Sequence, residues 1–235
     1  MIDFHSHILP CIDDGSGSIE ESIALLQTMS EQGIELVCAT PHFDALNNSL
    51  DAFLERRKNS YRSLLTAIEG AEMPKILLGA EVAYFEGISV ASGIRELCLG
   101  GTDVLLVEMP MSKWSKNTVS ELLELASSDF TVVIAHIERC ITYQHKSVIS
   151  ELLANGIIMQ ANASFFINPK TRKKALKLLH KGVIRLLGTD CHNMNVRPPR
   201  ASEAVSVISD NLGDEFLREM DAFAASVLLK SKIKA

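Results

Sequence analysis

The first residues of the chain carry a side-chain type that binds metal ions. Ile2 to His5 is predicted to be a short strand, and His7 follows His5 by two residues. Residues two apart in an extended strand project to the same side, so the two imidazoles are expected to lie together. Neutral imidazoles are common metal ligands. The alternative is a pair of surface histidines near the N-terminus, and this pair alone does not decide between them.

The same chemistry recurs where apolar runs end. Short apolar runs predict seven strands, over residues 2–5, 34–39, 75–79, 103–107, 131–135, 157–161 and 183–188. Six of them lead into a histidine or a carboxylate, namely His5 and His7, His42, Glu81, Glu108, His136, and Asp190 with His192. In α/β barrels the carboxyl ends of the strands form the active-site face. A set of surface or core residues without a function would not be expected to gather there.

Amphipathic segments separate these strands. Ser18-Ile-Glu-Glu21 is a capping box that opens a helix to about Gln32. Further helices are predicted over 50–69, 117–127, 146–154, 168–180, 200–212 and 214–229, while 84–100 is left as helix or loop. Strands that alternate with helices predict parallel βαβ units, in an α/β barrel or an open sheet. No linker or repeat interrupts them, so one domain over residues 1–235 is expected.

Composition narrows the classes of function. The chain has 235 residues with 47% hydrophobic and 22% charged residues, which is ordinary for a globular enzyme. Its net charge of −6 and lack of a basic tract argue against nucleic acid as a partner. No apolar run is long enough for a membrane span, and no signal-peptide pattern is present. The five cysteines are odd in number and contain no C-x-x-C pair, so we expect a cytoplasmic protein.

The residue types also favour particular metals. Several imidazoles mixed with carboxylates, without an organised set of cysteines, suit Mn²⁺, Fe²⁺ or Zn²⁺ better than Ca²⁺ or a structural zinc. The candidate ligands are too numerous for one ion, and Glu81 is suited to bridge two. Metal ions that share a bridging ligand are typical of enzymes that hydrolyse phosphate esters.

Taken together, the motifs resemble a known superfamily. They are His5-x-His7, Asp13-Asp14-Gly15, Thr40-Pro41-His42, Gly79-Ala80-Glu81, Glu108-x-Pro110, Ala135-His136-x-Glu138-Arg139, Gly188-Thr189-Asp190-x-His192-Asn193 and Arg197-Pro198-Pro199. The chain resembles the PHP (polymerase and histidinol phosphatase) superfamily over about residues 1–200. Within it, the chain is most similar to the bacterial manganese-dependent protein tyrosine phosphatases of capsule and exopolysaccharide synthesis.

The resemblance implies a distorted seven-stranded (β/α)7 TIM-like barrel with a trinuclear metal site that holds Mn²⁺, with Fe or Zn as alternatives. It also implies hydrolysis of phosphotyrosine on a protein, such as a bacterial tyrosine kinase. One ion would be held by His5, His7, Glu81 and Asp190, a second by Glu81, Glu108 and His136, and a third by Asp14, His42 and His192. Arg139 and Arg197 would bind the phosphoryl oxygens, and Asp14 or His42 would serve as a general acid.

Two positions depart from the pattern. Ile137 stands where the family usually has proline, and Cys11 stands where glycine is usual before Ile-Asp-Asp. Neither change removes a ligand. Both lie in segments that we expect to aim Arg139 or to admit the substrate.

Other interpretations remain open at this point. The same metal chemistry would serve a small-molecule phosphatase, such as one for histidinol phosphate, or the metals could stabilise a non-catalytic scaffold. Cys191-x5-Arg197 has the spacing of the cysteine-dependent tyrosine phosphatases but lacks glycine in the intervening loop. Arg139 could instead pair with Glu138, and Arg197 could be a solvated loop charge. Trp114 could flank a substrate ring or fill the core, and the sequence does not decide between a monomer and a homo-oligomer.

Overall fold

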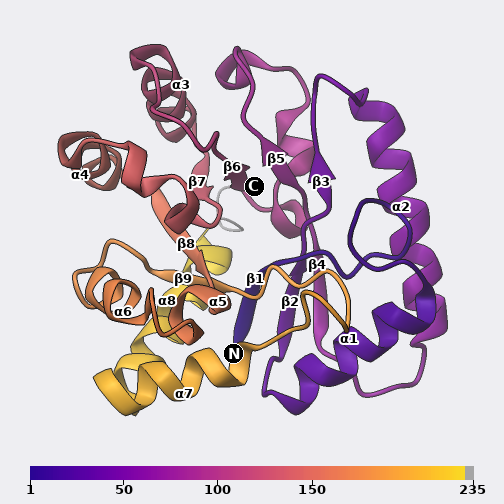
Figure 1. Ribbon diagram of the computed structural model, residues 1–235. Coiled ribbons are helices and arrows are strands. Elements are labelled where there is room, and N and C mark those ends of the chain that lie inside the picture. Colours follow the sequence, from indigo (N-terminus) through magenta and orange to yellow (C-terminus); the bar gives the residue numbers. More distant parts are fainter. Residues whose placement is uncertain (231–235) are drawn as a thin grey trace.

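Parallel strands occupy the centre of the molecule and helices surround them (Figure 1). The computed structural model describes residues 1–230. Its strands are β1 Ile2–Ser6, β2 Leu36–Ala39, β3 His42–Phe43, β4 Lys75–Leu78, β5 Glu81–Ala83, β6 Val104–Glu108, β7 Thr131–Ile134, β8 Ile158–Asn162 and β9 Leu186–Gly188. Every pairing between them is parallel. The predicted mixed α/β fold with a parallel sheet is therefore confirmed.

The helices mostly follow the predicted ranges. They are α1 Ile19–Glu31, α2 Leu50–Ala67, α3 Lys116–Ser127, α4 Lys146–Ala154, α5 Ala163–Ile167, α6 Arg172–His180, α7 Ala201–Leu212 and α8 Asp214–Lys230. Short 3₁₀ turns are η1 Ile88–Val90, η2 Ile94–Leu97, η3 Leu99–Gly101, η4 Ile137–Arg139 and η5 Ile141–Tyr143. The segment left open at 84–100 thus contains 3₁₀ turns. Within residues 1–230, no helix is both long and apolar enough to cross a bilayer.

One helix begins later than predicted. The Asn168-Pro169 pair was expected to open a helix, but α6 starts only at Arg172. The Asn168 carboxamide accepts a hydrogen bond from the Lys170 amide at 3.0 Å, which closes a local turn. This is the bond that an N-cap side chain makes to the second helical residue, but residues 169–171 form a turn, and Thr171 is the N-cap residue of α6.

The predicted count of seven strands is not confirmed. The strands form a three-stranded sheet, β1-β2-β4, and a six-stranded sheet, β3-β5-β6-β7-β8-β9. The two extra strands arise because Thr40 and Pro41 interrupt one apolar run, and Gly79 and Ala80 interrupt another. Proline has no amide hydrogen to donate to a ladder. Hydrogen bonds nevertheless cross both breaks, from the Gly79 amide to Ala39 and from the Glu81 amide to Pro41.

The sheets curl so that the last strand lies beside the first. The Asp190 amide donates to the His5 carbonyl at 2.8 Å, and the His7 amide donates to the Cys191 carbonyl at 2.9 Å. Side chains alternate between two apolar layers. Val104 and Leu106 of β6 pack with Val227 of α8, whereas the intervening Leu105 packs with the outer helices. Burial on both faces explains why the strands are almost continuously apolar.

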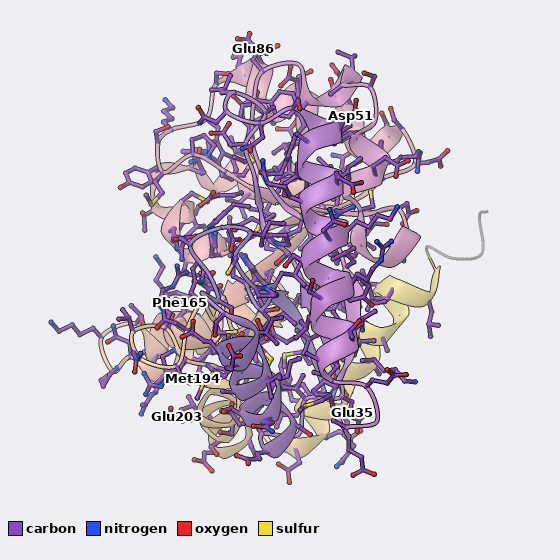
Figure 2. The ribbon with its side chains drawn as sticks, turned by 90° about the vertical axis from the view of Figure 1, so that its right-hand side faces the viewer. Glu35, Asp51, Glu86, Phe165, Met194 and Glu203 are labelled. Carbon is purple, nitrogen blue, oxygen red and sulfur yellow. The ribbon has the colours of Figure 1, made fainter. Side chains whose placement is uncertain are left out.

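A buried arginine ties α2 to the segments around the strand break. Helix α2 runs along one side of the molecule, with Asp51 near its start (Figure 2). Arg57 is 8% exposed and donates to the Gly79 carbonyl at 2.8 Å and to the Glu96 carbonyl at 2.7 Å. Gly79 lies two residues before Glu81, so this contact helps to fix the chain that carries the Glu81 carboxylate.

Replacing Arg57 with alanine is expected to lower the free energy of unfolding by about 3 kcal/mol, because two charge-assisted hydrogen bonds are lost, one to the buried Gly79 carbonyl and one to the partly buried Glu96 carbonyl. Urea denaturation measures the change. Arg62→Ala is the matched control, since Arg62 is exposed on the same helix, and it should change stability by less than about 0.5 kcal/mol. Equal effects of the two substitutions would contradict the role given to Arg57.

Candidate metal centre

Glu81 lies at the middle of a group of four imidazoles gathered from three different segments. Its Oε2 atom is 2.9 Å from His42 Nδ1, 3.1 Å from His5 Nε2 and 3.3 Å from His7 Nε2. Its Oε1 atom is 2.6 Å from His136 Nε2. Glu81 is buried, and so are His5, His7 and His136. The carboxyl ends of the strands therefore bring these side chains together, as their positions in the sequence predicted.

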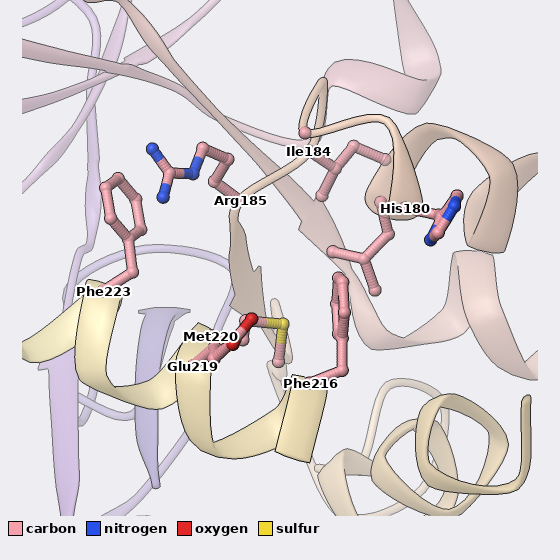
Figure 3. A pocket seen from close by; sticks show the side chains of 9 residues that line it. His180, Ile184, Arg185, Phe216, Glu219, Met220 and Phe223 are labelled. Carbon is pink, nitrogen blue, oxygen red and sulfur yellow. The ribbon is translucent and has the colours of Figure 1, made fainter. Parts of the chain in front are cut away.

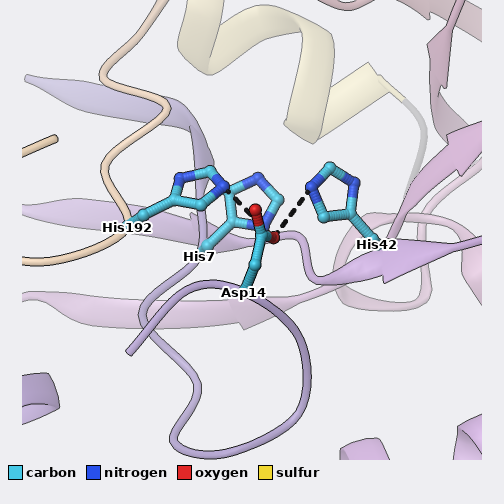
Figure 4. A group of neighbouring side chains, drawn as sticks. All are labelled: His7, Asp14, His42 and His192. Atoms are coloured by element: carbon cyan, nitrogen blue, oxygen red, sulfur yellow. Dashed lines mark ion pairs between the residues drawn. The ribbon is translucent and has the colours of Figure 1, made fainter. Parts of the chain in front are cut away.

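A second group borders the first (Figure 4). The Asp14 Oδ1 atom lies 3.3 Å from His42 Nε2 and 3.5 Å from His192 Nε2. The ring of His7 lies between the two groups, with its centroid 3.9 Å from that of His192. Asp14 is largely exposed, so this group faces the solvent side of the centre.

Asp190 joins the histidines to two arginines. Its Oδ1 atom faces the imidazoles of His7 at 3.5 Å and His5 at 3.6 Å. Its Oδ2 atom accepts from Nη2 of Arg139 and from Nη2 of Arg197, both at 2.6 Å. Arg139 therefore pairs with Asp190 instead of with Glu138, and Arg197 is not simply a solvated loop charge.

The charges in this centre depend on one another. Burial favours the neutral form of Glu81, but the surrounding imidazoles outweigh it and hold the pKa of this carboxyl well below its usual value. Burial also opposes the charged form of His5, but the carboxylates of Glu81 and Asp190 raise the pKa of this imidazole. The carboxylates are ionised and draw positive charge into the centre. A divalent cation can supply that charge in place of the imidazole protons.

The backbone is constrained where two candidate ligands leave their strands. His136 has φ 27° and Asp190 has φ 53°, a region that residues with a side chain rarely adopt. Such conformations concentrate at functional sites, where the surrounding structure enforces them. Next to Asp190, a Cβ on Gly188 would come within 2.6 Å of His5 Cβ and 2.7 Å of Gln160 Nε2. Only glycine allows β9 to approach β1 this closely.

The donor atoms fit metal ions. Ligand atoms of three groups lie within 4.8 Å of one another, and the groups are His7, Asp14, His42 and His192; His5, His7 and Glu81; and His42, Glu81 and Glu108. The buried Glu81 Oε2 atom makes no hydrogen bond of acceptable geometry. His5 Nε2 and His7 Nε2 point at each other across 3.1 Å. Nitrogen and oxygen atoms that converge in this way are the arrangement that a cation completes.

Two polar residues of β8 support this cluster, and Gln160 was not among the predicted site residues. Gln160 accepts from the His136 amide at 2.7 Å and lies 3.4 Å from His5 Nδ1. Its amide donates to Asn162, which in turn donates to Asp190 Oδ2 at 2.6 Å. Gln160 and Asn162 stand two residues apart in an otherwise apolar strand. That spacing was a usable signal, because it places both side chains on the same face.

Asp13 is a further support. It accepts from His7 Nδ1 at 2.8 Å and from the His42 amide at 3.0 Å. The acceptor on Nδ1 leaves Nε2 of His7 free to face Glu81. Hydrogen bonds of this kind orient metal-binding histidines.

Two other sequence features take no part in the centre. Cys191 is fully buried, and burial raises the pKa of its thiol far above the ordinary value. A buried thiol of this kind is a poor nucleophile. Trp114 is also buried in the apolar core, and its indole donates to the Pro110 carbonyl at 3.1 Å. It packs in the core and does not border the cluster of histidines and carboxylates.

A separate hollow lies at the opposite ends of the strands (Figure 3). It measures about 310 Å³ and is bordered by His180, Arg185 and Glu219, with Phe216 and Phe223 from α8. Arg185 precedes the amino end of β9 and stacks on the ring of Phe223. No candidate ligand borders this hollow, so it is distinct from the centre.

Together, the parallel α/β fold and the cluster at its carboxyl ends define a class of protein with a multi-histidine, multi-carboxylate centre. The chain belongs to the family of capsular polysaccharide synthesis proteins CpsB/CapC, whose model matches residues 1–230. It is 26% identical to the tyrosine-protein phosphatase CpsB of Streptococcus agalactiae serotype III, over 98% of this chain and 99% of that protein. It is 27% identical to the tyrosine-protein phosphatase YwqE of Bacillus subtilis, over 99% of this chain and 92% of that protein.

Solved structures agree with this assignment. One belongs to the crystal structures of YwqE from Bacillus subtilis and CpsB from Streptococcus pneumoniae, which are described as metal-dependent tyrosine phosphatases. It matches this chain with a TM-score of 0.82 and 26% sequence identity. It covers 97% of this chain and 94% of its own. The histidinol phosphate phosphatase of Lactococcus lactis has a TM-score of 0.55 and 14% identity, over 89% and 92% of the two chains. This second likeness shows a shared fold.

Proposed function

We propose that the protein is a metal-dependent phosphotyrosine-protein phosphatase. Its substrate would be a bacterial tyrosine kinase that regulates capsular or extracellular polysaccharide synthesis. The observation that carries the proposal is the cluster around Glu81 beside two arginines on Asp190, in a chain of the CpsB/CapC family. The relatives named above are tyrosine phosphatases, which supports phosphotyrosine as the substrate.

The proposed ligands are those of the resemblance, with Mn²⁺ as the metal. His5, His7, Glu81 and Asp190 would hold one ion, Glu81, Glu108 and His136 a second, and Asp14, His42 and His192 a third. Ligand atoms of His42, Glu81 and Glu108 also lie within 4.8 Å of one another. We retain His136 in the second set because its Nε2 atom lies 2.6 Å from Glu81 and 3.5 Å from Glu108.

We also propose that the strands form a distorted seven-stranded barrel of the PHP type. If β2 with β3, and β4 with β5, are each counted as one bent strand, seven strands follow one another around a distorted PHP-type barrel. The hydrogen bonds across both breaks and between β9 and β1 support this count. We propose one such domain over residues 1–235, of which the last five lie outside the described part. The cytoplasmic location stays a prediction from cysteine usage.

In the proposed reaction the arginines exchange one anion for another. Arg139 and Arg197 now share Asp190 Oδ2, and a phosphoryl group would accept the same planar, bidentate donors. Divalent ions at the neighbouring ligands would lower the pKa of water and so supply a nucleophile near neutral pH. Asp14 and His42 lie on the open side, and whichever of them is not bound to metal would deliver a proton to the departing phenolic oxygen. Phosphotyrosine needs little such help, because its phenolate is a good leaving group.

The test is a paired assay on protein stripped of metal with a chelator. A phosphotyrosine peptide and histidinol phosphate are compared, each with and without added Mn²⁺. Turnover of the peptide that returns with Mn²⁺, without comparable turnover of histidinol phosphate, is expected. Preference for histidinol phosphate would instead favour the small-molecule phosphatase. Binding of Mn²⁺ that raises the melting temperature without any turnover would favour the scaffold interpretation.

The same assay tests the cysteine mechanism. Cys191→Ser is expected to keep Mn²⁺-dependent turnover within a few-fold of the wild type, because the sulfur is buried away from the centre. Loss of activity in a folded variant that retains its metal would overturn this expectation. So would wild-type activity that survives complete removal of metal.

Gln160→Leu is expected to weaken Mn²⁺ binding by roughly 10- to 100-fold, the usual loss when a group that orients metal ligands is removed. Leucine keeps most of the side-chain volume but cannot bond to the His136 amide or to Asn162. Equilibrium Mn²⁺ binding is the measurement. Gln27→Leu, on an exposed position of α1, is the control. Unchanged affinity in a folded Gln160→Leu variant would show that the glutamine only fills space.

A further inference from the structure

A cleft beside the centre is lined by three arginines. The cleft measures about 370 Å³ and is bordered by Asp190, Arg139, Arg197 and Arg200. A second hollow of about 570 Å³ shares Arg139 and Arg200 with it. The open space is therefore continuous from the arginines on Asp190 to Arg200. In a chain of net charge −6, such a local excess of positive side chains suits an anionic partner.

Arg200 occupies an unusual position for its charge. It is the N-cap residue of α7, and its side chain makes no capping hydrogen bond. The N-terminal end of a helix dipole is positive, so a cation there adds to the charge of the helix end. Pro198 and Pro199 precede it and restrict the backbone. Arg200 is thus held at the cleft by a stiff segment, at an electropositive helix end.

The present partner of Arg200 holds it only weakly. Glu203 pairs with its guanidinium at 2.5 and 2.6 Å, but the two side chains are 46% and 50% exposed. Exposed ion pairs of this kind contribute little to stability. Glu203 can therefore orient the guanidinium toward the cleft and still give way to another carboxylate at little cost.

We propose that Arg200 forms a second anion subsite, which binds an aspartate or glutamate side chain close to the phosphotyrosine of the substrate protein. The inference rests on the proposed function, in which Arg139 and Arg197 hold the phosphoryl group. Because the cleft runs from these residues to Arg200, the substrate segment beside the phosphotyrosine passes the Arg200 guanidinium. A guanidinium fork matches a carboxylate in shape and charge. The subsite selects protein substrates with acidic residues near the phosphotyrosine.

The test compares matched phosphotyrosine peptides on the Mn²⁺-loaded enzyme, with aspartate, alanine or lysine on both sides of the phosphotyrosine. Wild-type enzyme is expected to prefer the aspartate peptide. Arg200→Ala should lower kcat/KM for that peptide by roughly 5-fold, mainly through KM, as for an exposed ion pair. The alanine peptide should change by less than about 2-fold. Raising the salt concentration should reduce the wild-type preference.

Two further variants sharpen the result. Arg218→Ala removes an arginine with the same i,i+3 pairing to a glutamate, Glu215, on α8, and it should leave all three peptides unaffected. Arg200→Glu should reverse the preference in favour of the lysine peptide, which a general loss of folding would not do. Equal losses on the aspartate and alanine peptides, or no wild-type preference, would overturn the subsite alone. No turnover of any phosphotyrosine peptide would overturn the proposed function together with the subsite.

Discussion

Glu81→Gln is expected to reduce phosphotyrosine hydrolysis by roughly 10³-fold or more, since metal ions supply several kcal/mol of transition-state stabilisation. Glu81 approaches four imidazoles with its two oxygens, so a neutral amide removes the charge that balances them. The substitution keeps the size of the side chain. The new amide NH₂ group would also face the imidazole nitrogens. Once these nitrogens bind metal, they cannot accept a hydrogen bond from it.

The measurement has two parts, turnover of a phosphotyrosine peptide and the metal content of the purified protein. Both should fall in Glu81→Gln, and the rise in melting temperature on adding Mn²⁺ should be lost. Glu86→Gln is the control, because Glu86 is exposed a few residues further along the chain (Figure 2). A folded Glu81→Gln protein with normal metal content would contradict the bridging role.

Arg139→Ala is expected to lower kcat/KM by about 10²- to 10³-fold, the usual loss for a group that stabilises charge in the transition state. Metal content should stay close to that of the wild type. Asp190 would keep its hydrogen bonds from Arg197 and Asn162, both at 2.6 Å, so the ligand would remain in place. Arg139→Lys should recover only part of the activity, because an ammonium group cannot bind two oxygens in one plane.

Steady-state kinetics and metal analysis on the same preparations separate binding of phosphate from binding of metal. Arg56→Ala, on the exposed side of α2, controls for the loss of one positive charge. If Arg139→Ala lost metal in proportion to activity, Arg139 would act mainly by holding Asp190. That outcome would contradict direct contact with the phosphoryl group.

Much of the fold was predictable because its signals are local. Apolar runs of a few residues predict strands, and a serine followed by a glutamate three residues later predicts the start of a helix. Neither pattern depends on contacts with distant residues. Ser18 does accept from the Glu21 amide, at the start of α1. The predicted start of α6 was too early: Asn168 does accept from the Lys170 amide, as an N-cap would, but the regular helix begins only at Arg172.

The gathering of the site residues was also predictable, and it depended on a single geometric rule. Parallel strands end at the same edge, so side chains that follow each strand meet there. His5, His136 and Glu81 were expected together on that ground, and both imidazoles lie within hydrogen-bond distance of the Glu81 carboxylate. The choice of metal and the division of ligands among ions do not follow from that rule.

By itself, the sequence determined which residues end the strands and what chemistry they share, because chain order and side-chain type are enough for a parallel sheet. Only the tertiary structure decided how the charges pair. Arg139 and Arg197 converge on Asp190, Gln160 links His136 to Asn162, and Arg200 borders the same cleft. The contacts of Arg139 with Asp190 and of Gln160 with His136 join residues far apart in sequence. Their partners are set by the curl of the sheet and by loop conformations such as those of His136 and Asp190, and no local pattern encodes them.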